Sequence, residues 1–101
     1  MDKSEIINIA SKYKAHIKNH IDFDELFLFG SYAKGNPREH SDIDIAVVVD
    51  TFSGDYMKTV QQLWILRKDI DVRIEPVLII KSEDIPGFLE EIKRTGILIN
   101  W

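Results

Sequence analysis

The strongest constraint on the fold is an apolar, β-branched run that two aspartates open. Residues 45–49 read Ile-Ala-Val-Val-Val, a composition typical of a strand covered on both faces. Asp42 and Asp44 lie at the start of this run, and alternate residues of a strand project to the same face, about 6 to 7 Å apart. We therefore expect two neighbouring carboxylates at the beginning of a central strand, where unpaired charge is costly.

Divalent cations would compensate this pair of carboxylates. Without a counter-ion, two adjacent carboxylates repel each other and one of them takes up a proton. Mg²⁺ prefers oxygen ligands, and two-metal sites hold their ions about 3.5 to 4 Å apart, a spacing that two adjacent carboxylates can bridge. Asp42 and Asp44 thus predict a magnesium site.

A glycine-serine turn upstream offers a site for phosphate. Residues 26–29, Leu-Phe-Leu-Phe, predict a short strand, and Gly30 after it permits close approach of the backbone. Ser31 provides a hydroxyl and an N–H group where the chain turns, and Lys34 adds positive charge. Together these groups are suited to binding an anion.

The two signals resemble a family motif. Through the segments Gly30-Ser31-Tyr32-Ala33-Lys34-Gly35 and Ser41-Asp42-Ile43-Asp44, the chain resembles the nucleotidyltransferase superfamily related to DNA polymerase beta, in particular its minimal nucleotidyltransferase (MNT) branch. The resemblance implies that Gly30 and Ser31 bind a nucleoside triphosphate, with ATP the expected co-substrate, and that Asp42 and Asp44 hold two Mg²⁺ ions. Lys34 stands where many members have Arg, which keeps the charge but loses the planar fork.

The resemblance also implies a third carboxylate on a later strand. Residues 70–75 alternate strictly between apolar and charged, which predicts a strand with Val72 and Ile74 on its inner face. Asp71 and Glu75 share the opposite face. Glu75 lies next to a wholly apolar run and is the favoured catalytic and metal-binding residue, and Asp71 is the alternative.

Helical periodicity flanks these strands. Residues 2–20 predict an amphipathic helix that Asp2 caps, residues 54–69 a second helix, and residues 83–94 a third that Gly96 stops. The inward-facing residues are expected to be Met57, Val60 and Trp64 in the second helix and Phe88, Leu89 and Ile92 in the third. Residues 97–99 complete the pattern as a short strand or extended tail.

The expected architecture is a single α+β domain, residues 1–101. It would have a twisted mixed sheet of about four strands, helices packed on one face and the acid-bearing face open. A chain of 101 residues with 45% hydrophobic content suits one modest core. The chain has no cysteine, which excludes disulfides and thiolate metal sites.

Hydrophobic patterning and net charge indicate where the protein is located and which partners it is expected to bind. No apolar stretch approaches the length of about 18 residues that spans a membrane, and the N-terminus lacks a signal-peptide pattern. A cytoplasmic protein without a membrane partner is therefore expected. A net charge of -4 argues against broad nucleic-acid binding.

The resemblance implies transfer of a nucleoside monophosphate from a triphosphate to a hydroxyl group. MNT proteins commonly act as antitoxins that adenylylate a helical HEPN partner, so a HEPN-domain protein is the implied acceptor, in a homo- or hetero-oligomer. Larger relatives carry an extra acceptor-binding domain, which we expect another subunit to supply here. The alternatives are a non-catalytic nucleotide-binding module that neutralises its partner by complex formation, and a small-molecule transferase of the aminoglycoside type.

Overall fold

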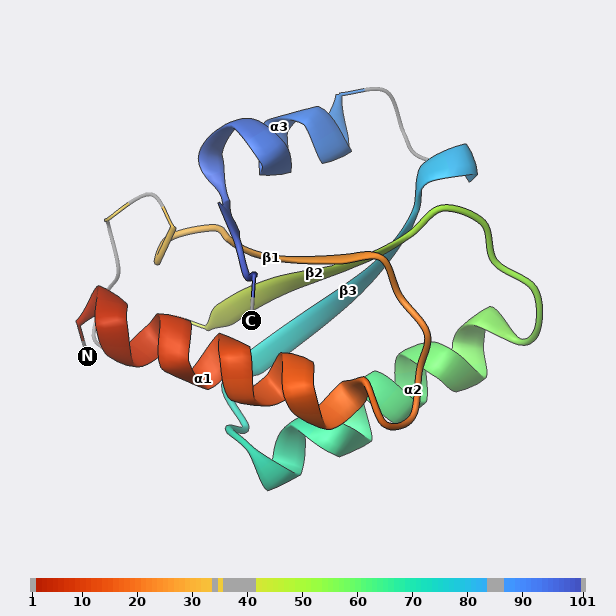
Figure 1. Ribbon diagram of the computed structural model, residues 1–101, viewed down its shortest axis with the longest axis horizontal. Helices are drawn as coiled ribbons and strands as arrows, with labels where there is room; N and C mark the ends of the chain where they lie inside the picture. Colours follow the sequence, from red (N-terminus) through yellow and green to blue (C-terminus); the bar gives the residue numbers. More distant parts are fainter. Residues whose placement is uncertain (1, 34, 36–41, 84–86, 101) are drawn as a thin grey trace.

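A mixed sheet of four strands forms the centre of this computed structural model, which describes residues 2–33, 35, 42–83 and 87–100 (Figure 1). The strands are β1 (Glu25–Phe29), β2 (Ile43–Val49), β3 (Ile74–Ile80) and β4 (Ile97–Leu98), in the spatial order β3-β2-β1-β4. The pairing of β2 is antiparallel with β1 and parallel with β3, and β4 pairs antiparallel with β1. The predicted α+β fold with a mixed sheet of about four strands is confirmed.

β2 is the central strand, and its side chains serve two separate cores. Every residue of β2 except Asp44 is buried. Ile43, Ile45 and Val47 belong to the apolar cluster under one face of the sheet, whereas Ala46 belongs to a smaller cluster on the other. The unbroken apolar run follows from this double burial.

Two helices, α1 (Lys3–Ile17) and α2 (Tyr56–Leu66), cover the first face (Figure 1). The Asp2 side chain accepts a hydrogen bond from the Glu5 N–H, so α1 begins at the predicted cap and ends at Ile17, earlier than expected. The side chains that α1 buries are spaced at helical intervals: Ile6, Ala10, Tyr13 and Ile17.

The inner face of α2 differs from the prediction. Leu63 and Leu66 are buried, whereas Met57 is 60% exposed and Trp64 lies at the surface beneath the Arg67 guanidinium, 4.7 Å from the ring centroid. Of the predicted inward residues, only Val60 packs against the core. Apolar residues occur around most of this helix, so periodicity did not single out one stripe.

The helix α3 (Phe88–Thr95) lies on the opposite face of the sheet from α1 and α2 (Figure 1). Its buried residues, Leu89 and Ile92, pack in a cluster with residues of three strands, namely Phe27, Ala46, Val48 and Ile79. The expectation of helices on one face therefore holds for α1 and α2 alone. The rest of the α3-bearing face, beyond Ala46 toward the start of β2, carries Asp44 outside this cluster.

The boundaries of α3 also differ from those predicted. A short 3₁₀ turn, Lys81–Glu83, follows β3, and α3 begins only at Phe88, with Gly87 as its N-cap in the left-handed conformation. Phe88 is 41% exposed, so it is not part of the inner stripe. The helix ends where it was predicted to end, with Gly96 as C-cap.

β3 is an edge strand, and its outer edge is partly blocked. The Tyr56 hydroxyl donates to the Leu78 carbonyl at 2.8 Å, and Arg67 Nη1 donates to the Ile74 carbonyl at 3.4 Å. Pro76 lies between these two residues in the same alternating set and has no N–H group to leave unpaired.

The helices described here include none that is long and apolar enough to cross a membrane.

A buried hydrogen bond between α1 and α2 yields a test of this packing. The Tyr13 hydroxyl donates to the Leu63 carbonyl at 2.8 Å, and burial raises the pKa of Tyr13. We expect Tyr13→Phe to cost about 1 kcal/mol and to lower Tm by about 4–8 °C. Tyr56→Phe removes a bond of the same length from a residue that is 40% exposed, where water substitutes, so its Tm should fall much less. Equal losses in thermal denaturation would contradict this account.

Candidate active site

The predicted site residues meet where β1 ends and β2 and β3 begin. Asp44 is the Cα partner of Phe29 on β1 and of Glu75 on β3, so it lies between these two residues in the sheet. Gly30 directly follows Phe29, and Asp42 precedes β2 by one position. Strand pairing alone thus gathers the glycine turn and all three carboxylates at one end of the sheet.

Gly30 lies against the Asp44 carboxylate. Its φ of +74° falls in the left-handed region, and a Cβ atom at this position would lie 2.1 Å from Asp44 Oδ2. Only glycine fits there. Ser31 is half-buried in the turn, and the buried side chain of Tyr32 anchors it to the core. Lys34, predicted to contact phosphate, lies outside the described residues.

Burial and mutual repulsion raise the pKa of two of the acids, Asp44 and Glu75. Burial raises the pKa of Asp44, and the neighbouring charge of Asp42 raises it further. Burial also raises the pKa of Glu75, assisted by a side-chain hydrogen bond to Asp42 and by the charges of both aspartates; the positive charge of Arg67 opposes this shift. The ionised forms of Asp44 and Glu75 are therefore disfavoured in the free protein.

Hard divalent cations fit this donor set by its chemistry. Like charge gathers at Asp42, Asp44 and Glu75, and a cation ligated by their oxygen atoms would offset the repulsion that helps to raise the pKa of Asp44 and of Glu75. Among the described residues, no three acidic, histidine or cysteine side chains already form a metal-binding group. The three carboxyl groups would have to move closer together to share an ion.

Asp71, the alternative third carboxylate, has another partner. The predicted strand over 70–75 is wrong in its first half: β3 begins at Ile74, and Val72 is 64% exposed rather than inward-facing. Asp71 Oδ1 accepts from the Arg73 backbone N–H at 2.9 Å, which closes a turn.

The Asp71 carboxylate also pairs with the Arg73 side chain. Asp71 Oδ1 accepts from Arg73 Nε at 3.0 Å, and Asp71 Oδ2 from Nη2 at 2.7 Å. These bonds lower the pKa of Asp71. Of the two candidate acids, Glu75 is thus the one that pairs with Asp44 in the sheet and whose pKa responds to the charges of both aspartates.

Sequence reasoning missed two features beside the acids. Arg67 donates to the carbonyls of Val72 and Ile74, which fixes the entry to β3, and its charge acts on Glu75. Phe29 meets Phe88 edge to face, with ring centroids 6.4 Å apart. The i, i+3 spacing of Trp64 and Arg67 signals only their contact with each other. The Arg67 bonds at the entry to β3 and the pairing of Phe29 with Phe88 required the tertiary fold.

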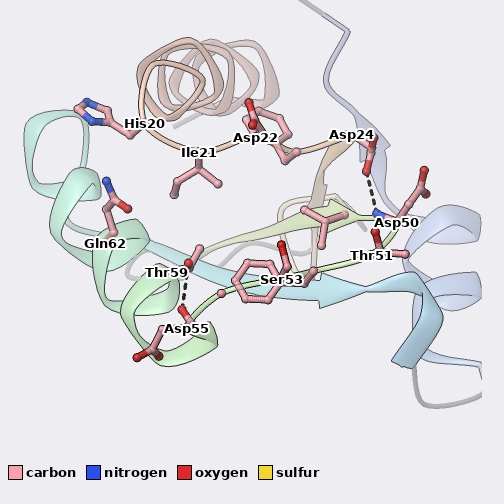
Figure 2. Close-up of a pocket in the computed structure, with 14 residues that line it drawn as sticks. His20, Ile21, Asp22, Asp24, Asp50, Thr51, Ser53, Asp55, Thr59 and Gln62 are labelled. Carbon is pink, nitrogen blue, oxygen red and sulfur yellow. Dashed lines mark hydrogen bonds between the residues drawn. The ribbon is translucent and has the colours of Figure 1, made fainter.

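A separate cavity of about 600 Å³ lies at the opposite end of β2, beside Val49 (Figure 2). Its wall carries four aspartates, Asp22, Asp24, Asp50 and Asp55. Three of them have partners: Asp24 accepts from the Asp50 N–H at 2.7 Å (Figure 2), the Asp50 carboxylate pairs with Lys81 Nζ at 3.1 Å, and Asp55 caps α2 through the Lys58 N–H at 3.1 Å. The five residues from Asp44 to Val49 span about 16 Å of strand, so this cavity is not part of the acid site.

The fold and the site agree with a comparison against protein families. Residues 4–100 match the family model described as Polymerase beta, Nucleotidyltransferase. The chain belongs to this nucleotidyltransferase family. It is therefore a nucleotidyltransferase, and the resemblance carried by its two motifs is confirmed.

Relatives in sequence and in structure cover most of this nucleotidyltransferase. MJ1215 of Methanocaldococcus jannaschii, named as a candidate protein adenylyltransferase, is 33% identical over 72 residues, which are 71% of this chain and 83% of MJ1215. MJ0141 of the same organism, named in the same way, is 29% identical over 97 residues, 92% of this chain and 97% of its own.

Solved structures share the fold. A candidate nucleotidyltransferase from Sulfolobus solfataricus superimposes with a TM-score of 0.68 at 18% identity, covering 95% of this chain and 80% of its own. A toxin-antitoxin structure with AMP-PNP gives a TM-score of 0.64 at 22% identity, covering 99% and 73% respectively. At these identities the likeness concerns the fold alone.

The contact between Gly30 and Asp44 yields a test with a matched control. Gly35 has a similar φ of +80°, and a Cβ added there would meet nothing within 4 Å. Alanine at either position incurs about 1–2 kcal/mol for the left-handed backbone. Only Gly30→Ala displaces the Asp44 carboxylate, so we expect it to weaken the Mg²⁺-dependent ATP binding that the resemblance implies at least about tenfold by calorimetry, whereas Gly35→Ala retains the affinity. Equal affinities in the two variants would exclude a role for the contact.

The Asp71 and Glu75 carboxylates should differ in their effect on stability. Asp71→Asn loses its negative charge and the Oδ2 atom that accepts from Arg73 Nη2, and we expect a cost of about 1 kcal/mol in urea denaturation at neutral pH. Because folding lowers the pKa of Asp71, its contribution is present above the ordinary value of 3.8 and is lost as the pH falls through the folded pKa. The cost of Asp71→Asn should therefore shrink on acidification. Glu75→Gln relieves repulsion and should not destabilise the metal-free protein; a loss equal to that of Asp71→Asn would refute this distinction.

Proposed function

We propose that this nucleotidyltransferase moves AMP from ATP to a hydroxyl group of a partner protein, with Mg²⁺ as cofactor. The observation that carries the proposal is the register of the sheet, in which Asp44 lies against Gly30 on one side and pairs with Glu75 on the other. A phosphate-binding turn and a cluster of oxygen ligands at one end of a sheet are what transfer from a nucleoside triphosphate needs.

Each residue at this end of the sheet has a role in the proposal. Asp42, Asp44 and Glu75 would hold two Mg²⁺ ions, and Gly30 and Ser31 would bind the β- and γ-phosphates through backbone N–H groups and the hydroxyl. When bound, the ions supply neutralisation of charge on the attacking and leaving oxygens. Lys34, adjoining the same turn in sequence, would add a positive charge for the phosphates.

The identity of the acceptor rests on the relatives. MJ1215 and MJ0141 are both named as candidate protein adenylyltransferases, and structures of similar fold include a toxin-antitoxin with AMP-PNP and the toxin-antitoxin MntA-HpeT. We infer by analogy that this chain is the antitoxin of such a pair, acts on a hydroxyl of a HEPN-domain partner and functions in the cytoplasm as part of a hetero-oligomer.

A labelling experiment tests the proposed transfer. The protein is co-expressed with a HEPN-domain partner, purified, and incubated with Mg²⁺ and ATP labelled at the α-phosphate. We expect label on the partner protein, a loss of at least about a hundredfold in Asp42→Asn and in Glu75→Gln, and retained complex formation in both. Chelation of Mg²⁺ should abolish labelling in the unchanged protein.

Asp71→Asn is the matched control, because it makes the same chemical change to an acid four residues from Glu75 that pairs with Arg73. It should retain most of the labelling at a temperature where it is folded. Complex formation without labelling in the unchanged protein would indicate a non-catalytic binding module. Label on a small molecule in place of the partner would indicate a transferase of the aminoglycoside type.

A further inference from the structure

An apolar groove runs along the outer edge of β3, from Val77 toward the carboxyl end of the strand at Ile80. It encloses about 650 Å³ between the segment that begins α2 and two residues beyond β3, Glu83 and Phe88. Its described lining is largely apolar and includes three side chains that are substantially exposed, Tyr56, Val77 and Phe88. Glu83 is its one acidic lining residue among those described.

One end of the groove, at Val77, lies near the acids. Val77 lies two residues after Glu75 on the same face of β3, about 6 to 7 Å along the strand, and pairs with Ala46 of β2. At the other wall, Phe88 contacts Phe29, the residue that immediately precedes Gly30. The groove therefore starts within two strand residues of Glu75 and extends away from it toward Ile80.

The chemistry of transfer assigns a side of the sheet to each reactant. The acceptor oxygen bonds to the α-phosphorus, the bond from that phosphorus to the bridging oxygen of pyrophosphate breaks, and the hydroxyl proton passes to the Glu75 carboxylate. Attack must come from the side opposite the leaving pyrophosphate. If the pyrophosphate lies at Gly30 after β1, the acceptor enters over β3, because β2 lies between these strands.

The edge of β3 favours docking by side chains over addition of a strand. The outward carbonyls of Ile74 and Leu78 already accept bonds from Arg67 and Tyr56, and Pro76 has no N–H to offer. A partner segment would find few backbone groups to pair with there. It would find instead an apolar groove of a size that suits one or two large side chains.

We propose that this groove binds an apolar stretch of polypeptide next to the hydroxyl that accepts the nucleotide. The inference rests on the proposed function and narrows its acceptor: apolar residues flank the accepting side chain. A polar polycation such as an aminoglycoside gains nothing from the apolar wall formed by Val77 and Phe88.

Two peptides of equal charge test the proposal. Ac-Lys-Leu-Tyr-Leu-Lys-NH₂ and Ac-Lys-Ser-Tyr-Ser-Lys-NH₂ are each titrated into the ¹⁵N-labelled full chain without nucleotide, and amide shifts are followed by NMR. We expect the leucine peptide to bind about tenfold more tightly, the effect of half-burying one leucine side chain, with shifts centred on Val77 and Phe88. Binding of both peptides with equal strength, or shifts centred elsewhere, would overturn the proposal.

Matched substitutions locate the site. Val77→Asp should remove the preference for the leucine peptide, whereas Val72→Asp should keep it, because Val72 is a still more exposed valine outside the groove. Val77→Thr is the variant to use if Val77→Asp does not fold, and should lower the preference by about threefold. An unchanged preference in the Val77 variants refutes the proposal. The proposal is also refuted if the amide shifts of groove residues vary with protein concentration before peptide is added, because a second copy then fills the groove.

Transfer of labelled AMP to the two tyrosine peptides separates this proposal from the proposed function. Transfer to both peptides at equal rates would leave the nucleotidyltransferase proposal intact and overturn the groove. Absence of transfer to peptide and partner alike, with the leucine preference still present in NMR, would overturn the proposed acceptor chemistry while the peptide-binding groove stands.

Discussion

The parallel pairing of β2 with β3 is the constraint on which the site depends. It places Glu75 opposite Asp44, although the two residues are far apart in the chain. Two neighbouring parallel strands cannot be joined by a tight turn, so the chain crosses over through α2 and the 3₁₀ turn Arg67–Asp69. The packing of that crossover, which includes the bond from Tyr13 to Leu63, therefore sets the position of the Glu75 carboxylate on β3.

The site concentrates like charge, and the core beneath it compensates for this. Asp44 and Glu75 both have a raised pKa because burial and neighbouring acids disfavour their ionised forms. A small protein tolerates such repulsion only where the surrounding structure is stable. Here β2 supplies that stability from both faces, with Ile45 and Val47 packed toward α1 and α2 and Val48 packed toward α3.

Local patterns predicted the strands near the acids better than they predicted the packing of the helices. The strand over 45–49 and the turn at Gly30-Ser31 were predictable because each sequence pattern indicates a single local structure. The alternation over 70–75 was misleading, because the Asp71 side chain closes a turn with the backbone of Arg73 that competes with strand formation. The alternation of apolar and charged residues does not reveal a hydrogen bond of this kind.

The two-sided sheet was visible in the sequence but not followed through. An apolar run of the kind over 45–49, and Leu-Phe-Leu-Phe before Gly30, require cover on both faces, yet the predicted architecture had helices on one. α3 supplies the second cover. Which helix takes that role, and how far along the strands it reaches, depends on tertiary packing of Leu89 and Ile92 that no local period encodes.

Pro76 has a consequence for the behaviour of this chain in concentrated solution. A seven-residue strand that is apolar except for one glutamate, at the border of a sheet, would ordinarily recruit strands from neighbouring molecules and seed cross-β stacking. The missing amide hydrogen at Pro76 interrupts such a ladder at its centre, and the Tyr56 hydroxyl blocks it one step later. The end of the sheet that carries the acids must be open for the chemistry. The outer edge of the same sheet, formed by β3, is thereby protected against self-assembly into fibrils.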